Sequence, residues 1–149
     1  MSEHPASLSW SRNDRPFTYE AYSRDHVLVF ENGQRSLASS APDFVGNPEA
    51  LNPETLLVGS LASCHMLTFL AICAKRGHVV EHYDDEASGL LDKNAEGKMA
   101  ITRITLRPKV VFSGDKQPNA EELAKLHERA HANCFIGSSL RTEVHVEPR

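Results

Sequence analysis

The chain has 149 residues, enough to bury the core of one domain, and we expect a single domain over residues 1–149. Hydrophobic residues make up 40% and charged residues 24%, an ordinary balance for a globular protein. The formal net charge is −4 and no basic run occurs, which argues against nucleic acid or an anionic membrane as a partner.

The first fifty residues have the pattern of short strands joined by turns. Asn32-Gly33, between two runs rich in β-branched residues, is a strong hairpin signal. A further alternating stretch precedes these runs, after a cluster of turn residues at 13–16. We therefore expect three or four short strands, at residues 7–12, 17–23, 26–30 and 35–39, and then a loop over 41–51.

The longest apolar segment, residues 52–77, is predicted to be a helix around which the rest is organised. Asn52 is a good N-cap, Pro53 fits the first turn, and Gly77 favours a left-handed stop. The interior is apolar nearly all round, which predicts burial on most faces. Its Ser, His, Thr and Cys residues interrupt it too often for a membrane span.

The sequence pattern of the second half of the chain predicts two long strands, a helix and a last strand. Asn119 and Glu122 form a capping box at the start of that helix, and Gly137 is expected to close it. The resulting order of elements predicts an α+β fold with mostly antiparallel pairing. The expected strands cover residues 78–91, 99–112 and 140–146.

The three cysteines are expected to be free thiols. The first residues lack the basic and apolar regions of a signal peptide, so we expect a cytoplasmic location, where a disulfide would be transient. Cys73 lies nine residues after Cys64, half a turn away on the helix, so the two should face opposite sides. Cys73 is therefore predicted to be a small buried hydrophobic residue.

Cys134 ends the second helix on one face with His127 and His131, and three kinds of chemistry remain open at this point. Cys64 would be an attacking thiolate that Cys134 resolves as a disulfide. Alternatively, Cys64, His65, His131 and Cys134 would bind zinc, although adjacent helical residues form a poor chelating pair. In a third reading, Cys64 is the nucleophile of an acyl transfer with a histidine base.

The run NPETLL…ASCHMLTFL, followed some seventy residues later by AHANCFIGSSL, resembles the OsmC/Ohr family of osmotically inducible and organic hydroperoxide resistance proteins. The resemblance implies an intertwined homodimer with mostly antiparallel sheets wrapped around a long central helix. It also implies a thiol peroxidase that reduces organic hydroperoxides without a cofactor or metal. A small dithiol or a lipoylated protein is the implied reductant.

The resemblance also assigns the site residues. Cys64 matches the cysteine that attacks the peroxide, and Cys134 matches the resolving cysteine. Glu54 matches a glutamate that orients an active-site arginine. A carboxylate suits this role, because it can hold the guanidinium group by two hydrogen bonds.

The family places that arginine near the first strands, where Arg12, Arg15 and Arg24 all qualify. We favour Arg24, because Ser-Arg-Asp-His at residues 23–26 resembles a segment of an OsmC-like subgroup. An arginine suits this role, since it remains charged and its fork can contact both sulfur and peroxide oxygen.

Glu54 lies ten residues before Cys64, about 15 Å along a continuous helix. A glutamate side chain cannot span that distance. Glu54 would then come from the helix of a second subunit, which the small residues around Gly59 would allow to approach closely. The alternative is a helix broken near Gly59.

The alternative to an enzyme is a non-enzymatic dimer on the same fold that senses redox state or binds a small molecule.

Overall fold

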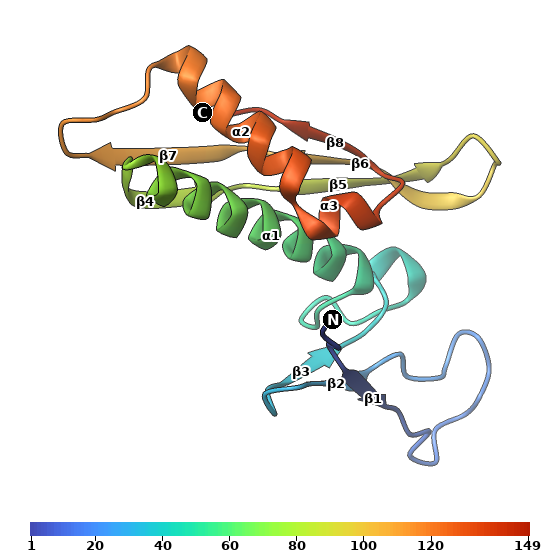
Figure 1. Ribbon diagram of the computed structural model, residues 1–149. Helices are drawn as coiled ribbons and strands as arrows, with labels where there is room; N and C mark the ends of the chain where they lie inside the picture. The colour runs from blue at the N-terminus through green and yellow to red at the C-terminus, as the bar shows by residue number, and fades with distance from the viewer. The chain divides into compact units, whose positions relative to one another are not determined.

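The computed structural model describes residues 1–149. The chain divides into two compact units, Met1–Leu56 and Leu57–Arg149 (Figure 1). Helix α1 (Pro53–Arg76) begins at the end of the first unit and continues without a break through the start of the second. The alternative of a helix broken near Gly59 is therefore wrong.

The first unit contains a three-stranded antiparallel sheet in the order β1-β2-β3. Gly33, at φ +79°, forms the predicted hairpin, which the amide of Gly33 closes by donating to Phe30 O at 2.9 Å. A single 3₁₀ turn, η1 (Pro42–Phe44), lies in the loop that follows. The strands are β1 (Ala6–Ser9), β2 (His26–Phe30) and β3 (Arg35–Ala38).

Residues 17–23 do not form the expected strand. The amides of Ala21 and Tyr22 both donate to the carbonyl of Thr18, at 3.1 and 3.0 Å, so the backbone turns here instead of extending. Alternation alone was misleading, because a strand also needs a neighbour that accepts its hydrogen bonds.

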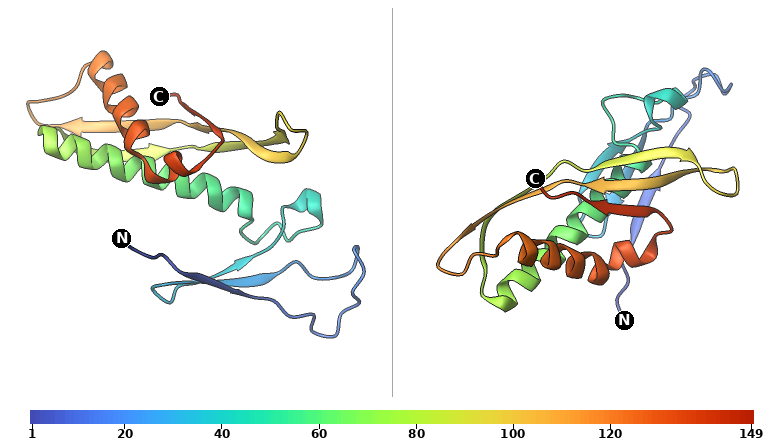
Figure 2. Two further views of the ribbon diagram at one scale, coloured as in Figure 1. Left: turned by 45° about the vertical axis from the view of Figure 1, so that its right-hand side comes forward. Right: turned by 90° about the horizontal axis from the view of Figure 1, so that it is seen from above.

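In the second unit, α1 and α2 lie on the same side of the long strands (Figures 1 and 2). These strands form two sheets, one that pairs β4 with β7 and one in the order β5-β6-β8. All pairings between the named strands are antiparallel except β6 with β8, and one isolated bridge, Ala38 with Leu51, is also parallel. This confirms the predicted mostly antiparallel α+β fold. The remaining elements are β4 (Val79–Asp85), β5 (Ser88–Lys93), β6 (Met99–Leu106), β7 (Pro108–Ser113), α2 (Ala120–Asn133), α3 (Phe135–Ser139) and β8 (Glu143–Val146).

Each long strand predicted after α1 is broken in two. The first is interrupted at residues 86–87 and the second at Arg107, whose amide donates to Asp85 Oδ1 at 2.7 Å instead of to a neighbouring strand. Burial raises the pKa of Asp85, despite that hydrogen bond and the nearby charges of Arg149 and Arg107. The last strand is also shorter than expected, because only Glu143–Val146 pairs with β6.

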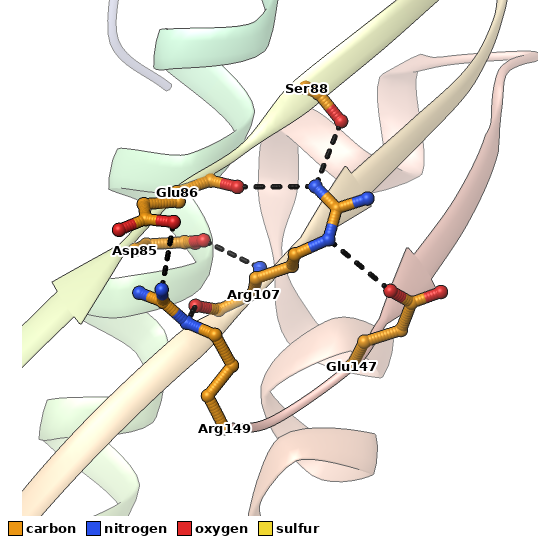
Figure 3. A network of polar contacts seen from close by, with 6 residues as sticks. All are labelled: Asp85, Glu86, Ser88, Arg107, Glu147 and Arg149. Carbon is orange, nitrogen blue, oxygen red and sulfur yellow. Dashed lines mark hydrogen bonds and ion pairs between the residues drawn. The ribbon is translucent and has the colours of Figure 1, made fainter.

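A polar network holds the chain end against this break (Figure 3). Arg107 donates to Ser88 Oγ at 3.0 Å and contacts Glu147 Oε2 at 3.4 Å. Arg149 contacts Glu86 Oε2 at 2.8 Å and donates through Nε to the carbonyl of Arg107 at 2.9 Å. The C-terminal residues are thereby attached to the junction between these two sheets.

Helix α1 is buried on one face only. Its buried residues lie four apart, whereas Leu67 on another face is 60% exposed, so the expectation of burial on most faces is wrong for a single chain. The helix is also long and apolar enough to cross a membrane by composition alone, with a mean hydropathy of 2.0, contrary to our expectation. One face of the helix packs in the core of this chain. The buried residues of α1 are Leu61, His65, Phe69 and Cys73.

The second predicted helix begins as expected and ends earlier. The Asn119 side chain accepts from the amide of Glu122, whose carboxylate accepts from the amide of Asn119, which confirms the capping box. The helix stops at Asn133, however, because Cys134 adopts an extended conformation. Gly137 does not close α2 but lies within the short helix α3.

Candidate functional site

The fold brings Cys64 and Cys134 together. Cys64 lies in the middle of α1, and Cys134 is the residue between α2 and α3. The two side chains pack against each other in one cluster of the core, and each thiol shifts the pKa of the other. The amide of Ile136 donates to Cys64 Sγ at 3.5 Å, and the amide of Gly137 donates to Cys134 Sγ at 3.3 Å. The first turn of α3 therefore supplies a backbone N–H to each sulfur.

These contacts make the two thiols unequal in acidity. Burial alone would raise the pKa of Cys64, but hydrogen bonds from the Cys134 thiol and from the amides of Ile136 and Phe135 lower it below its ordinary value. Burial, together with the hydrogen bond to Cys64, raises the pKa of Cys134 to about 11. Cys64 is consequently the more acidic thiol of the pair, and Cys134 is the less acidic one.

Cys64 opens into a groove of about 1060 Å³ along the exposed side of α1. This volume is at the upper end of what small-molecule sites enclose. Leu67 and Phe135 form apolar walls and are 60% and 84% exposed. Cys134, in contrast, is fully buried. An organic molecule can therefore reach the sulfur of Cys64 before that of Cys134.

Cys73 is placed as the sequence predicts. It is 1% exposed and packs with Phe69, Leu126 and Ala130 in a cluster away from the two contacting thiols. Burial raises its pKa to about 11, although the charge of Arg76 opposes this. Cys73 is therefore a poor nucleophile.

The histidines are arranged differently from the zinc alternative. His65 Nε2 and His127 Nδ1 are 3.1 Å apart, and both rings are buried, whereas His131 is exposed. Burial lowers the pKa of both His65 and His127 to about 4, so both are neutral at pH 7. The structure gathers no three His, Cys, Asp or Glu side chains that could hold a metal ion. The structure does not bring Cys64, His65, His131 and Cys134 together around one point.

The other predicted site residues, Arg24 and Glu54, lie in the first unit. The guanidinium of Arg24 is buried in its own loop, where it donates to the carbonyls of Tyr19 and Tyr22. It also stacks over the Tyr22 ring, 3.9 Å from the ring centroid. Glu54 is half-buried in the first turn of α1. Their roles beside Cys64 remain predictions.

The two alternative arginines are held less firmly. Arg12 donates to the carbonyl of Arg15 at 2.8 Å and forms an exposed ion pair with Asp14 at 3.5 Å. Arg24 is the only one of the three candidates that is buried, because both Arg12 and Arg15 are exposed. The tyrosines that hold Arg24 were not singled out in the sequence, although Tyr19 and Tyr22 precede it closely enough to have suggested a cation–π contact.

A pair of neighbouring thiols, one with a lowered pKa and one with a raised pKa, on an α+β fold is the site of a dithiol protein. The family model described as "OsmC-like protein" matches residues 46–149. The chain belongs to this OsmC-like family, which confirms the resemblance seen in its sequence motifs.

Individual relatives agree with this assignment. The structure of an OsmC-like protein of unknown function from Vibrio cholerae has a TM-score of 0.95 and 46% identity, with 100% of both chains covered. The uncharacterized protein YmaD of Bacillus subtilis is 28% identical over 127 residues, 84% of each chain. The organic hydroperoxide resistance protein OhrB of Bacillus subtilis has a TM-score of 0.72 at 16% identity, covering 99% of this chain and 98% of its own. At that identity it shows a common fold alone.

Proposed function

We propose that this protein is a cytoplasmic cysteine-based peroxidase that reduces organic hydroperoxides. The observation that carries the proposal is the contact between Cys64, whose pKa is lowered, and Cys134, whose pKa is raised to about 11. Membership of the OsmC-like family, in which several structural relatives are organic hydroperoxide resistance proteins, points to the same chemistry.

The reaction needs a thiolate at Cys64 and a second thiol beside it. The Cys64 thiolate attacks the terminal oxygen of the hydroperoxide, the O–O bond breaks, and the alkoxide takes up a proton and leaves as an alcohol. Cys64 is then a sulfenic acid. The sulfur of Cys134 attacks it, the hydroxyl leaves as water, and a Cys64–Cys134 disulfide forms. A small dithiol or a lipoylated protein reduces that disulfide by thiol–disulfide exchange.

We propose that the protein acts as a homodimer. Leu67 on the open side of α1 is 60% exposed in one chain, and Gly59, Ser60 and Ser63 offer an exposed surface that a second helix can approach closely. Because α1 is unbroken, Glu54 stands about 15 Å along the axis from Cys64, too far to act on it within one chain. In this proposal, Glu54 of the partner subunit orients Arg24 beside Cys64.

A turnover assay tests the function. Wild-type protein, supplied with tert-butyl hydroperoxide and dihydrolipoamide, should consume many equivalents of peroxide per chain, and Cys64→Ser should consume none. In stoichiometric peroxide, two thiols per chain should disappear and mass spectrometry should find Cys64 joined to Cys134. Cys134→Ser should trap the sulfenic acid at Cys64 and then lose activity through over-oxidation.

The same assay separates the enzyme from a non-enzymatic dimer on the same fold. A sensor would consume one equivalent of peroxide and stop, with dihydrolipoamide present in excess. A disulfide that includes Cys73 would contradict the proposed pairing, because Cys73 lies in a different cluster of the core.

A further inference from the structure

A second, smaller pocket of about 290 Å³ lies between α2 and the C-terminal strand β8. Arg129 and Asn133 of α2 line the groove at Cys64, whereas other residues of the same helix line this second pocket. The pocket therefore lies on another face of α2 and is separate from the dithiol site. Its lining residues are Ala124, His127, Glu128, His131, Val144, Val146 and Pro148.

His127 has an unpartnered nitrogen at this pocket. Its side chain is 3% exposed and stacks on Phe69, with 4.3 Å between the ring centroids. Nδ1 lies 3.1 Å from His65 Nε2 of α1, so the other ring nitrogen, Nε2, is directed away from α1. Nε2 is buried and has no hydrogen-bond partner. A buried polar atom of this kind is costly unless a partner from solution satisfies it.

His131 follows one helical turn after His127. Residues 127–131 read His-Glu-Arg-Ala-His, and side chains four positions apart are neighbours on a helix, so both imidazoles line the one pocket. Two histidines at this spacing, with a glutamate directly after the first, form a metal-binding pattern on a helix. Glu128 lines the same pocket and forms no ion pair. Its carboxylate is thus free to accept a hydrogen bond from metal-bound water.

The contact between His65 and His127 suits a metal ligand. A ligating imidazole usually donates a hydrogen bond through its other nitrogen, and this bond fixes its tautomer and the orientation of its ring. With the proton of His127 on Nδ1 and donated to His65 Nε2, the Nε2 atom of His127 has a free lone pair. His65 therefore supplies the second group that a metal-binding histidine needs.

We propose that His127 Nε2 and the imidazole of His131 bind a divalent transition-metal ion such as Zn²⁺, with water in its remaining coordination positions. Imidazole ligands suit Zn²⁺, Cu²⁺ and Ni²⁺. Because no group of three His, Cys, Asp or Glu side chains is placed to hold a metal, the inference is the binding of an ion with open positions and not zinc-dependent hydrolysis. It is independent of the proposed peroxidase function.

Calorimetry with Zn²⁺ alone tests the site in Cys64→Ser/Cys134→Ser protein, where the reactive thiols do not compete for the ion. This protein should bind one Zn²⁺ per chain. Loss of a group that orients a ligand costs about 10–100-fold in metal affinity, so loss of a ligand by His131→Ala should weaken binding by at least about tenfold. His131 is exposed, and its replacement should leave the fold intact.

The matched control is His82→Ala in the same background, which removes another exposed imidazole outside the pocket. This variant should bind Zn²⁺ as tightly as its parent. Equal affinities of the two histidine variants, or no measurable binding by the parent, would overturn the proposal.

Nuclear magnetic resonance decides whether the buried imidazole takes part. In long-range ¹H–¹⁵N spectra of the wild-type protein, the signal of His127 Nε2 should shift when Zn²⁺ is added, while Nδ1 keeps its proton. His131 should respond at the same Zn²⁺ concentration. A response of His131 without one of His127 would mean that the ion is held only at the surface, and the proposal would be wrong.

Discussion

Helix α1 presents two cysteines in opposite environments. Cys64 borders an open groove, accepts a hydrogen bond from a backbone amide and is hydrogen-bonded to a second thiol, which together lower its pKa. Cys73, from the same helix, is 1% exposed, and burial raises its pKa to about 11. The residue type and the secondary structure are the same in both cases. The difference in acidity comes from what packs against each side of the helix.

The same contrast extends to the neighbouring aromatic residues. Phe69 is fully buried between α1 and the sheet, where it packs near Cys73, whereas Phe135 is 84% exposed beside Cys64. One side of α1 therefore contributes to stability, and the other is open to a ligand or a partner. Four measurements test this contrast.

The largest difference should appear in alkylation by iodoacetamide at pH 7. Only the thiolate reacts, and a thiol with a pKa of about 11 is almost entirely protonated at that pH. Cys64 should therefore react at least about 100-fold faster than Cys73 in the native protein, as measured by peptide mass spectrometry. In guanidinium chloride the two should react at similar rates. Similar rates in the native state would contradict the assigned environments.

The next effect concerns the partner subunit. Glu54→Ala keeps Cys64, and Cys64→Ser keeps Glu54, and each variant alone should be inactive. Refolded together, they should form a heterodimer with one intact site if Glu54 acts across the interface. Activity should then rise from none to at most half of the wild-type value per heterodimer. Confirmed heterodimers without activity would show that Glu54 and Cys64 do not cooperate between subunits.

Core packing should distinguish the two phenylalanines. Phe69→Ala should lower the free energy of unfolding by about 3–5 kcal/mol, because it leaves a cavity in the core. Phe135→Ala should change it by less than about 0.5 kcal/mol, as expected for an exposed position. Urea unfolding at equal chain concentrations measures both. An equally large loss for Phe135→Ala would mean that a second copy covers this residue.

The last effect, and the smallest for a change of one pH unit, is a pH dependence from the buried imidazoles. His65 and His127 have pKa values of about 4 in the folded chain and an ordinary value of 6.5, so the unfolded chain binds more protons between these values. The free energy of unfolding should therefore fall as the pH drops from 6.5 to 4, by at most about 1.4 kcal/mol per pH unit for each imidazole. His65→Gln/His127→Gln should show a shallower dependence in urea unfolding, and an unchanged slope would contradict the assignment.

Local signals in the sequence determined much of this protein. Asn52 caps α1 through a hydrogen bond from the amide of Thr55 at 2.8 Å, as its side chain predicts. The capping box of α2 and the hairpin at Gly33 were equally readable, because each depends on residues within a few positions of one another. The nine-residue spacing of Cys64 and Cys73 was enough to place them on opposite sides of the helix.

Only the tertiary structure decided the rest. The strand break at Arg107 depends on Asp85, which lies 22 residues away, and the parallel pairing of β8 with β6 depends on a partner some forty residues distant. The contact between Cys64 and Cys134, and with it the unequal acidity of the two thiols, joins segments seventy residues apart. Periodicity and capping depend on interactions between residues that are close in the sequence. Burial, pKa and charge complementarity depend on which distant segments come into contact.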